Sequence, residues 1–188
     1  NADKIFNYGE VLQGDNDRIE EYQKVIGATT ASSYGATIRS SINSGNLLAS
    51  KMENLQISVD NPTAVTWVES HDNYCNDGSY KTVDDNEVIR AWAIICARKN
   101  GTPLFYDRPY GATADNMWGT MNRIGAAGNP FYKDATVVAV NRFRNAMVGQ
   151  GEKLINPDDT KKVLLIERGT KGSVVVNGSD KEYKLNVK

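Results

Sequence analysis

Residues 64–72 read AVTWVESHD, and they join a strand-like run to a polar turn. The β-branched and aromatic residues between Ala64 and Glu69 predict a buried strand. Ser70, His71 and Asp72 follow directly, so we expect them in the loop at the carboxyl end of that strand. His71 is the only histidine of the chain. This junction is therefore the first candidate for a functional site.

Strands and helices are expected to alternate on both sides of this junction. Further strands are predicted at residues 4–12 (KIFNYGEVL), 24–30 and 102–106 (TPLFY). Helices are predicted at residues 17–25, 36–43, 84–99 and 134–147, and the third of these has the clearest apolar periodicity. Alternation at this spacing predicts βα units around a parallel sheet.

The pattern changes near residue 156. Short β-type runs separated by Gly, Asn and Asp turn residues follow at 161–167, 172–176 and 182–187. The sequence therefore predicts two units, an α/β unit in residues 1–155 and a small antiparallel β unit in residues 156–188.

Three of the predicted loops carry a carboxylate, at Glu10, Asp72 and Asp107. Parallel strands bring the loops at their carboxyl ends to one face, where barrel enzymes build their active sites. The 62 positions between Glu10 and Asp72 fit two βα units of about thirty residues each, and Asp107 lies one unit further. Carboxylates gathered in this way suit proton transfer and stabilisation of a cationic transition state.

Each of these groups also has a structural interpretation. Glu10 fits a solvated or loop-capping carboxylate, and Ser70-His71-Asp72 fits a hydrogen-bonded turn. A catalytic triad among those three is excluded, because adjacent residues on one turn cannot point at one another in the required geometry. Asp107-Arg108 is more typical of a structural ion pair or loop anchor than of a catalyst. The residues alone leave these alternatives open.

The composition excludes several classes of function. The net charge is −1 and no basic stripe is present, so nucleic-acid binding has no support. The longest apolar run, residues 91–97, is far too short to cross a membrane. Cys75 and Cys96 are expected to be free thiols, because one lies in a loop and the other deep in a helix. A single histidine without a CxxC motif argues against a zinc or transition-metal site.

Longer motifs give these positions a family context. TWVESHDNYCND (residues 66–77) closely resembles the segment around the seventh barrel strand of bacterial α-amylases, where a His-Asp pair follows the strand. FNYGEVLQ (6–13) is similar to the fifth-strand segment with the proton donor, and RAWAIICARKNGTPLFYDRP (90–109) to the helix and eighth strand. AVNRFRNAM (139–147) resembles the last barrel helix. These motifs occur in family order and nearly end to end.

The resemblance implies a fold and an activity. The fold would be the second half of a (β/α)8 TIM barrel, strands 5–8, in residues 1–155, followed by the start of a C-terminal β-sandwich domain in residues 156–188. The activity would be retaining endo-hydrolysis of α-1,4-glucosidic bonds in starch and related glucans. Glu10 would be the general acid and then the base, and Asp72 would stabilise the transition state. The residues that would bind substrate are His71, on the sugar hydroxyls, with Leu12, Gln13 and Asn76.

Other parts of such an enzyme are expected outside this chain. In the family, the nucleophilic Asp ends the fourth strand, about one βα unit before Glu10, so the chain alone is expected to be inactive. No metal or cofactor is expected here, and any calcium of the intact enzyme would be held by an inserted domain. The expected partners are an α-glucan and either the missing N-terminal half of the barrel or another copy of the chain. The family also implies secretion.

Two other interpretations remain open at this stage. The same motifs serve transglycosylases and α-1,6-active relatives, because loops set the choice of bond. A non-catalytic glucan-binding fragment is the third interpretation, and retention of both Glu10 and Asp72 argues against it.

Overall fold

The computed structural model describes residues 5–14, 17–55 and 63–185. Its first sheet is parallel and contains β1 (Thr29–Thr30), β2 (Ala64–Thr66) and β3 (Thr102–Pro103) in that order. The segment before β1 extends this sheet through a parallel bridge between Gly9 and Thr29. Four strand-like segments therefore lie side by side in sequence order, and the predicted parallel sheet is confirmed.

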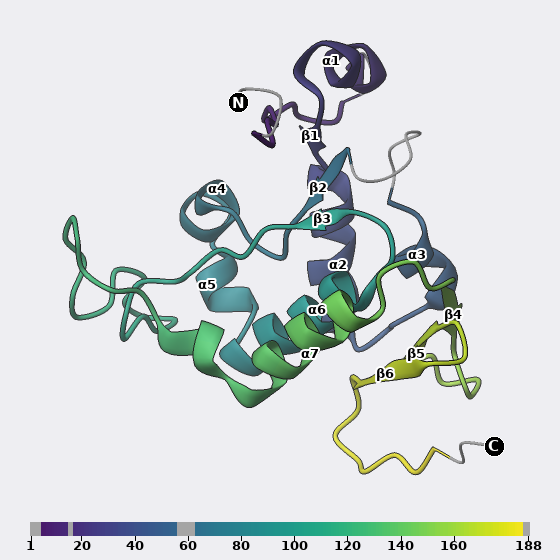
Figure 1. Cartoon of the computed structure of the whole chain (residues 1–188). Coiled ribbons are helices and arrows are strands. Elements are labelled where there is room, and N and C mark those ends of the chain that lie inside the picture. Colours follow the sequence, from purple (N-terminus) through teal and green to yellow (C-terminus); the bar gives the residue numbers. More distant parts are fainter. Residues whose placement is uncertain (1–4, 15–16, 56–62, 186–188) are drawn as a thin grey trace.

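Three helices pack on one side of this sheet: α2 (Ser32–Ser44), α6 (Asp85–Ala97) and α7 (Ala135–Ala146) (Figure 1). α2 packs against β2 and α6, and α6 packs against α7. Their buried apolar side chains form one cluster, which includes Ile38, Ala64 and Ile95. The helices predicted at residues 84–99 and 134–147 are confirmed.

Local signals set the bounds of these helices. Asp84 accepts a hydrogen bond from the Glu87 backbone N–H at 2.8 Å, and the Glu87 carboxylate accepts one from the Asp84 N–H, which completes a capping box at α6. Asp134 caps α7 in a similar way, by accepting from the backbone of Thr136. Gly45 ends α2 with φ 64°, a left-handed conformation that favours glycine.

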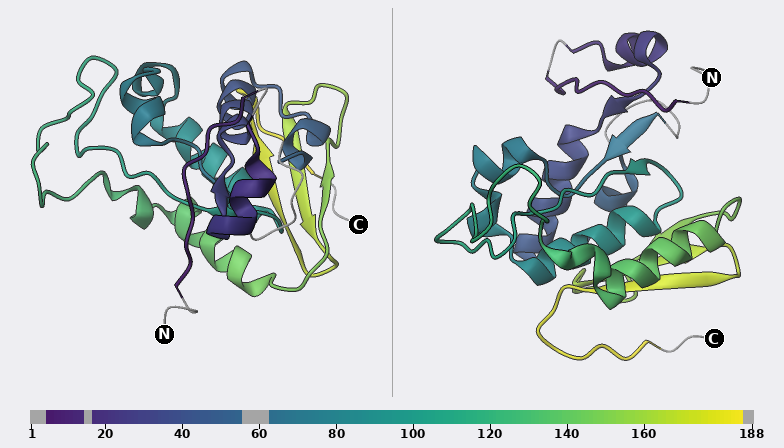
Figure 2. Two further views of the ribbon diagram at one scale, coloured as in Figure 1. Left: turned by 90° about the horizontal axis from the view of Figure 1, so that it is seen from above. Right: turned by 60° about the vertical axis from the view of Figure 1, so that its left-hand side comes forward.

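Five shorter helical segments complete the described part of the first unit. Only α1 was predicted among them, at residues 17–25. They are α1 (Ile19–Ile26), α3 (Ala49–Glu53), α4 (His71–Cys75), α5 (Ser79–Thr82) and the 3₁₀ segment η2 (Pro130–Lys133). A long irregular loop runs from β3 to η2 and projects away from the helices, which the left view of Figure 2 shows.

The second sheet is antiparallel and contains β4 (Lys153–Ile155), β5 (Val163–Arg168) and β6 (Gly172–Asn177). It packs against the helices, since β6 contacts α6 and β4 contacts α3. Leu164, Ile166 and Val176 belong to the same apolar cluster as the helix residues. The boundary expected between residues 155 and 156 falls at the end of β4.

Several of the predicted strands are shorter than expected or, within the described residues, absent. The strand expected at 64–69 ends at Thr66, and the one expected at 102–106 ends at Pro103. Among residues 5–12 only Gly9 pairs, because this edge segment has a strand neighbour on one side alone within the described chain. Lys24 belongs to the last turn of α1, and strand pairing begins only after Gly27, whose φ is 102°. Residues 182–185 are irregular, and the rest of the strand expected at 182–187 lies outside the described residues. Across the described ranges, no helix is long and apolar enough to span a membrane.

Candidate active site

The register of the parallel sheet divides its residues between two faces. Because side chains alternate along a strand and aligned residues share a face, Thr30, Trp67 and Leu104 lie on one side. Ala64 and Val68 lie on the other side, in the cluster shared with α2 and α6. The first face therefore turns away from the helices.

A pocket of about 220 Å³ lies on this face, which we call the helix-free face because α2 and α6 pack on the opposite side of the sheet. Strand positions, the loops after the strands and the Gly9 segment all contribute to its wall. Its aromatic rings and few polar groups are typical of a small-molecule site. It is lined by Tyr8, Glu10, Thr30, Trp67, Glu69, Ser70, His71, Leu104, Phe105 and Tyr106. Two of the residues expected at the site, Glu10 and His71, thus share one pocket although 61 positions separate them.

The backbone around Glu10 is fixed on both sides by the end of β1. Gly9 donates to the carbonyl of Ala28 at 2.9 Å and accepts from the N–H of Thr30 at 3.1 Å. The Thr30 hydroxyl then accepts from the Val11 N–H at 3.1 Å and donates to the Val11 carbonyl at 3.2 Å. This double contact presents the exposed Glu10 side chain at the edge of the pocket.

His71 and Asp72 open the short helix α4, and Ser70 is its cap. The Ser70 hydroxyl accepts a hydrogen bond from the backbone N–H of Asn73 at 3.4 Å. The His71 Nε2 lies 3.5 Å from Asp72 Oδ1, and both side chains are largely exposed, at 72% and 51%. Asp72 does not line the pocket itself, but its imidazole neighbour does.

The three lesser substrate-binding candidates have different surroundings. Asn76 donates from Nδ2 to Asp72 Oδ1 at 3.1 Å, so it orients a carboxylate in this structure. Gln13 Oε1 accepts from the Ser33 N–H at 2.7 Å, which satisfies a free donor at the start of α2. Leu12 is exposed over 68% of its surface and is not among the residues that line the pocket.

Glu69 and Arg108 form a buried pair that the sequence did not identify as part of the site. Arg108 donates from Nε to Glu69 Oε2 and from Nη2 to Glu69 Oε1, each at 2.8 Å. Both side chains are almost fully buried, at 1% and 5% exposure. Burial opposes the guanidinium charge, but hydrogen bonds to Glu69 and its charge raise the pKa of Arg108 above its usual value. The sequence signal that could have identified Glu69 is its position two residues after Trp67, because side chains two apart on a strand share a face.

Asp107 does not line the pocket, and its side chain is exposed. Desolvation raises its carboxyl pKa above the usual range. Of the dipeptide Asp107-Arg108, it is thus Arg108 that forms an ion pair and anchors the loop, through its contacts with Glu69.

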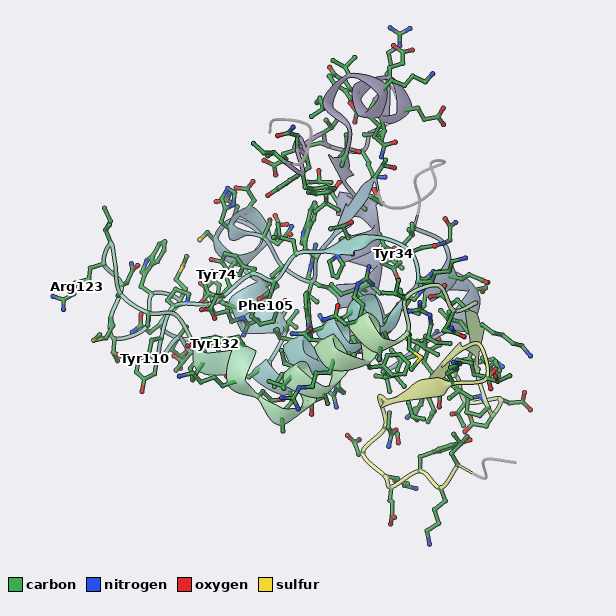
Figure 3. The ribbon with its side chains drawn as sticks, in the orientation of Figure 1. Tyr34, Tyr74, Phe105, Tyr110, Arg123 and Tyr132 are labelled. Carbon is green, nitrogen blue, oxygen red and sulfur yellow. The ribbon has the colours of Figure 1, made fainter. Side chains whose placement is uncertain are left out.

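Tyrosine side chains pack against one another at α4. The buried Tyr74 donates from its hydroxyl to the Met117 carbonyl at 2.6 Å, and its ring lies 5.5 Å from that of Tyr106. Burial raises the pKa of both phenols to about 12, so both stay protonated at neutral pH. Figure 3 shows Tyr74 and Phe105 in the middle of the molecule, and Tyr110 and Arg123 at the outer end of the long loop.

Metal-ligating side chains are not gathered in this part of the molecule. Within the described ranges, no three His, Cys, Asp or Glu side chains lie close enough together to hold an ion. Cys75 and Cys96 are both free, as predicted.

Comparison with known proteins gives a consistent result. No family model matches the chain. It is 47% identical over 192 residues to an α-amylase of Butyrivibrio fibrisolvens, a match that covers 94% of the chain and 20% of the relative. It is 39% identical over 188 residues to an α-amylase of Clostridium acetobutylicum, with 99% and 22% covered. The chain thus spans about a fifth of the length of these curated relatives.

Solved structures show the same fold at lower sequence identity. Two crystal structures of α-amylase I from Eisenia fetida match the chain with a TM-score of 0.65 and 17% identity. One is the wild-type enzyme and the other a Glu-to-Gln mutant in complex with maltohexaose. Each match covers 92% of this chain and 40% of the other. Over nearly its whole length, this chain therefore matches bacterial α-amylases, and it corresponds to only the C-terminal part of such an enzyme.

Proposed function

We propose that this chain is the acid/base-bearing part of a retaining α-amylase-type enzyme that hydrolyses α-1,4-glucosidic bonds within starch and related glucans. The observation that carries the proposal is the shared pocket. Glu10 and His71 come from distant loops and line one cavity on the helix-free face of the parallel sheet, with Asp72 beside His71. The relatives named α-amylase support the same reaction class.

The proposal includes an architecture. The Gly9 segment, β1, β2 and β3 correspond to strands 5–8 of a (β/α)8 barrel in residues 1–155, and residues 156–188 begin a C-terminal β-sandwich. The parallel order of the four segments supports this, because barrel strands follow one another in sequence order. The helix-free face would then be the inner face of the barrel.

The chemistry follows from the two carboxylates. Glu10 donates a proton to the glycosidic oxygen as the bond to the anomeric carbon breaks, and a nucleophilic carboxylate from another segment forms the glycosyl–enzyme bond. Glu10 then removes a proton from the water that hydrolyses this intermediate. Asp72 stabilises the oxocarbenium-like transition state, and His71 binds hydroxyls of the same sugar. Leu12, Gln13 and Asn76 complete the substrate contacts, and Asn76 also holds Asp72.

The partner that completes the site would be the N-terminal half of the barrel. The Gly9 segment and β3 are both edge positions of the described sheet, and unpaired strand edges tend to recruit further strands. Phe6 and Leu12 are more than half exposed beside the first of these edges. Another copy of the chain is the alternative partner. Secretion and calcium binding by the intact enzyme belong to the same proposal.

A chimera tests the proposal directly. The chain would replace the matching segment of the Butyrivibrio fibrisolvens α-amylase, and hydrolysis of amylose would be measured. Glu10→Gln is expected to lower kcat by about 10²–10⁴-fold, because it removes the transferred proton. Asp72→Asn is expected to lower it by about 10²–10³-fold, because it removes transition-state stabilisation. Glu20→Gln, an exposed carboxylate on α1, is the matched control and should leave kcat unchanged.

Product analysis separates the alternatives. A retaining hydrolase first releases the α-anomer, which proton NMR detects before mutarotation. Cleavage of pullulan in preference to amylose, or transfer to maltose instead of water, would point to the α-1,6-active or transglycosylase relatives. A folded chimera that binds maltohexaose without turnover would favour a glucan-binding fragment. The chain without its partner should not hydrolyse starch, and turnover that disappears in Asp107→Ala would contradict this.

A further inference from the structure

Arg108 contacts the start, the middle and the end of the segment that carries His71 and Asp72. This segment leaves β2, forms α4 and α5, and ends where α6 begins. Before α4, Arg108 forms the two-pronged ion pair with Glu69. Within α4, its guanidinium lies 5.5 Å from the centre of the Tyr74 ring. After α5, it donates to the Val83 carbonyl at 2.7 Å and to Asp85 Oδ1 at 3.1 Å.

Glu69 is held equally firmly from its own side. Its Oε1 also accepts a hydrogen bond from the Ser79 hydroxyl of α5 at 2.5 Å. Both carboxylate oxygens are therefore engaged by donors although Glu69 lines the pocket. A buried carboxylate whose two oxygens already accept hydrogen bonds from the protein has little capacity left to contact a substrate. Glu69 thus differs from Glu10, which is exposed at the same pocket.

We propose that Glu69 and Arg108 are positioning residues, which hold α4 so that His71 lines the pocket with Asp72 beside it. The proposal rests on the proposed function for its catalytic consequence. Its physical basis is independent of that function: one guanidinium from the loop after β3 joins the start, the middle and the end of the segment between β2 and α6. Since His71 and Asp72 are themselves exposed, their own side chains provide little packing to fix them.

A substitution that keeps the charge but removes the planar fork tests this role. Arg108→Lys cannot reach both Glu69 oxygens, Val83 and Asp85 together, because an ammonium lacks the guanidinium geometry. In the amylase chimera it is expected to lower kcat at least tenfold while KM changes less than threefold. Glu69→Gln, which preserves side-chain shape, should have the same kind of effect and replaces Arg108→Lys if that variant does not fold.

The matched control is Glu152→Gln. Glu152 forms an equally buried ion pair with Arg98, at 3.0 Å, and does not line the pocket. It is expected to lower the melting temperature while kcat stays within twofold of the parent below that temperature. Folded Arg108→Lys and Glu69→Gln variants that both keep kcat within twofold of the parent would overturn the proposal.

A second readout does not need turnover. Cys75 lies in α4, three positions after Asp72, so its alkylation rate reports how firmly α4 is held. Peptide mass spectrometry of iodoacetamide-treated chimera should show Cys75 modified at least fivefold faster in Arg108→Lys, with Cys96 unchanged. Equal Cys75 rates in variant and parent would refute the positioning role. An inactive parent chimera with the expected change at Cys75 would refute the proposed function alone.

Discussion

Two buried arginine–carboxylate pairs stand in different parts of the molecule. Arg108 and Glu69 lie beside the pocket, and Arg98 and Glu152 lie where the helices meet the antiparallel sheet. Their shortest distances are nearly equal, at 2.8 and 3.0 Å, and all four side chains are at most 10% exposed. The two pairs therefore have the same chemistry. The residues that surround them differ, and these surroundings decide what each pair stabilises.

The pair near the sheet lies beside two arginines that donate hydrogen bonds to the buried C-terminal end of α6. Arg144 donates to the carbonyls of Cys96 and Arg98, and Arg168 donates to that of Ala97 at 3.0 Å. These are the carbonyls that a helix leaves unsatisfied at its last turn. Arginines from α7 and β5 thus cap α6 and fasten the second sheet to it. By contrast, Arg108 holds loops and short helices.

The largest expected effect is on the pair near the sheet. Arg98→Met removes the partner of Glu152 and the donor to Tyr34, so a buried carboxylate is left without its cation. Such losses typically cost about 3–5 kcal/mol. Native-state hydrogen exchange of α6 amides in the chimera should show that decrease. Arg18→Met, which removes an exposed pair with Glu21, is the control, and a loss at Arg98 below about 1 kcal/mol would contradict the comparison.

The two cysteines offer a probe in each region. Cys96 is buried near Arg144, and burial raises its thiol pKa to about 11, whereas Cys75 is only partly buried. Only about one Cys96 thiol in a thousand is ionised at pH 8, and the thiolate is the reactive form. Iodoacetamide should therefore modify Cys75 at least a hundredfold faster, and the Cys96 rate should rise as the pH approaches 11. Similar rates in the native protein would show that the region near Arg98 opens freely.

The sequence predicted the framework well because strong local signals set it. The apolar periodicity of residues 84–99 and the cap at Asp84 predicted α6, and β-branched residues predicted β2. Strand spacing placed Glu10 and His71 near each other, and both line one pocket. The Glu69–Arg108 pair could not be predicted in the same way, because it depends on a contact across 39 positions that no local pattern encodes. α4 was missed since a five-residue helix capped by Ser70 resembles a polar turn in sequence.

A smaller effect on stability is expected from Ser79→Ala, which removes a hydrogen bond to Glu69. The hydroxyl donates to Glu69 Oε1 inside the protein, so its removal deletes one hydrogen bond to a buried charge. Glu69 keeps both bonds from Arg108, which limits the cost to about 1–2 kcal/mol. Hydrogen exchange of α4 and α5 amides would measure it, with exchange in α7 as the internal reference. A loss as large as that of Arg98→Met would mean that Ser79, and not Arg108, is the main partner of Glu69.

Asp85→Asn should have the smallest effect of these three substitutions, although Asp85 contacts the same guanidinium at 3.1 Å. Its side chain is 52% exposed, and water screens ion pairs of this kind, so their contribution is typically below about 1 kcal/mol. Asparagine also retains an oxygen that accepts from Arg108. If hydrogen exchange at the start of α6 shows a loss of stability above about 2 kcal/mol, the exposed Arg108–Asp85 contact is as strong as the buried Arg108–Glu69 contact. Burial would then not be what distinguishes the partners of Arg108, and the positioning of α4 would have to be assigned to Asp85 together with Glu69.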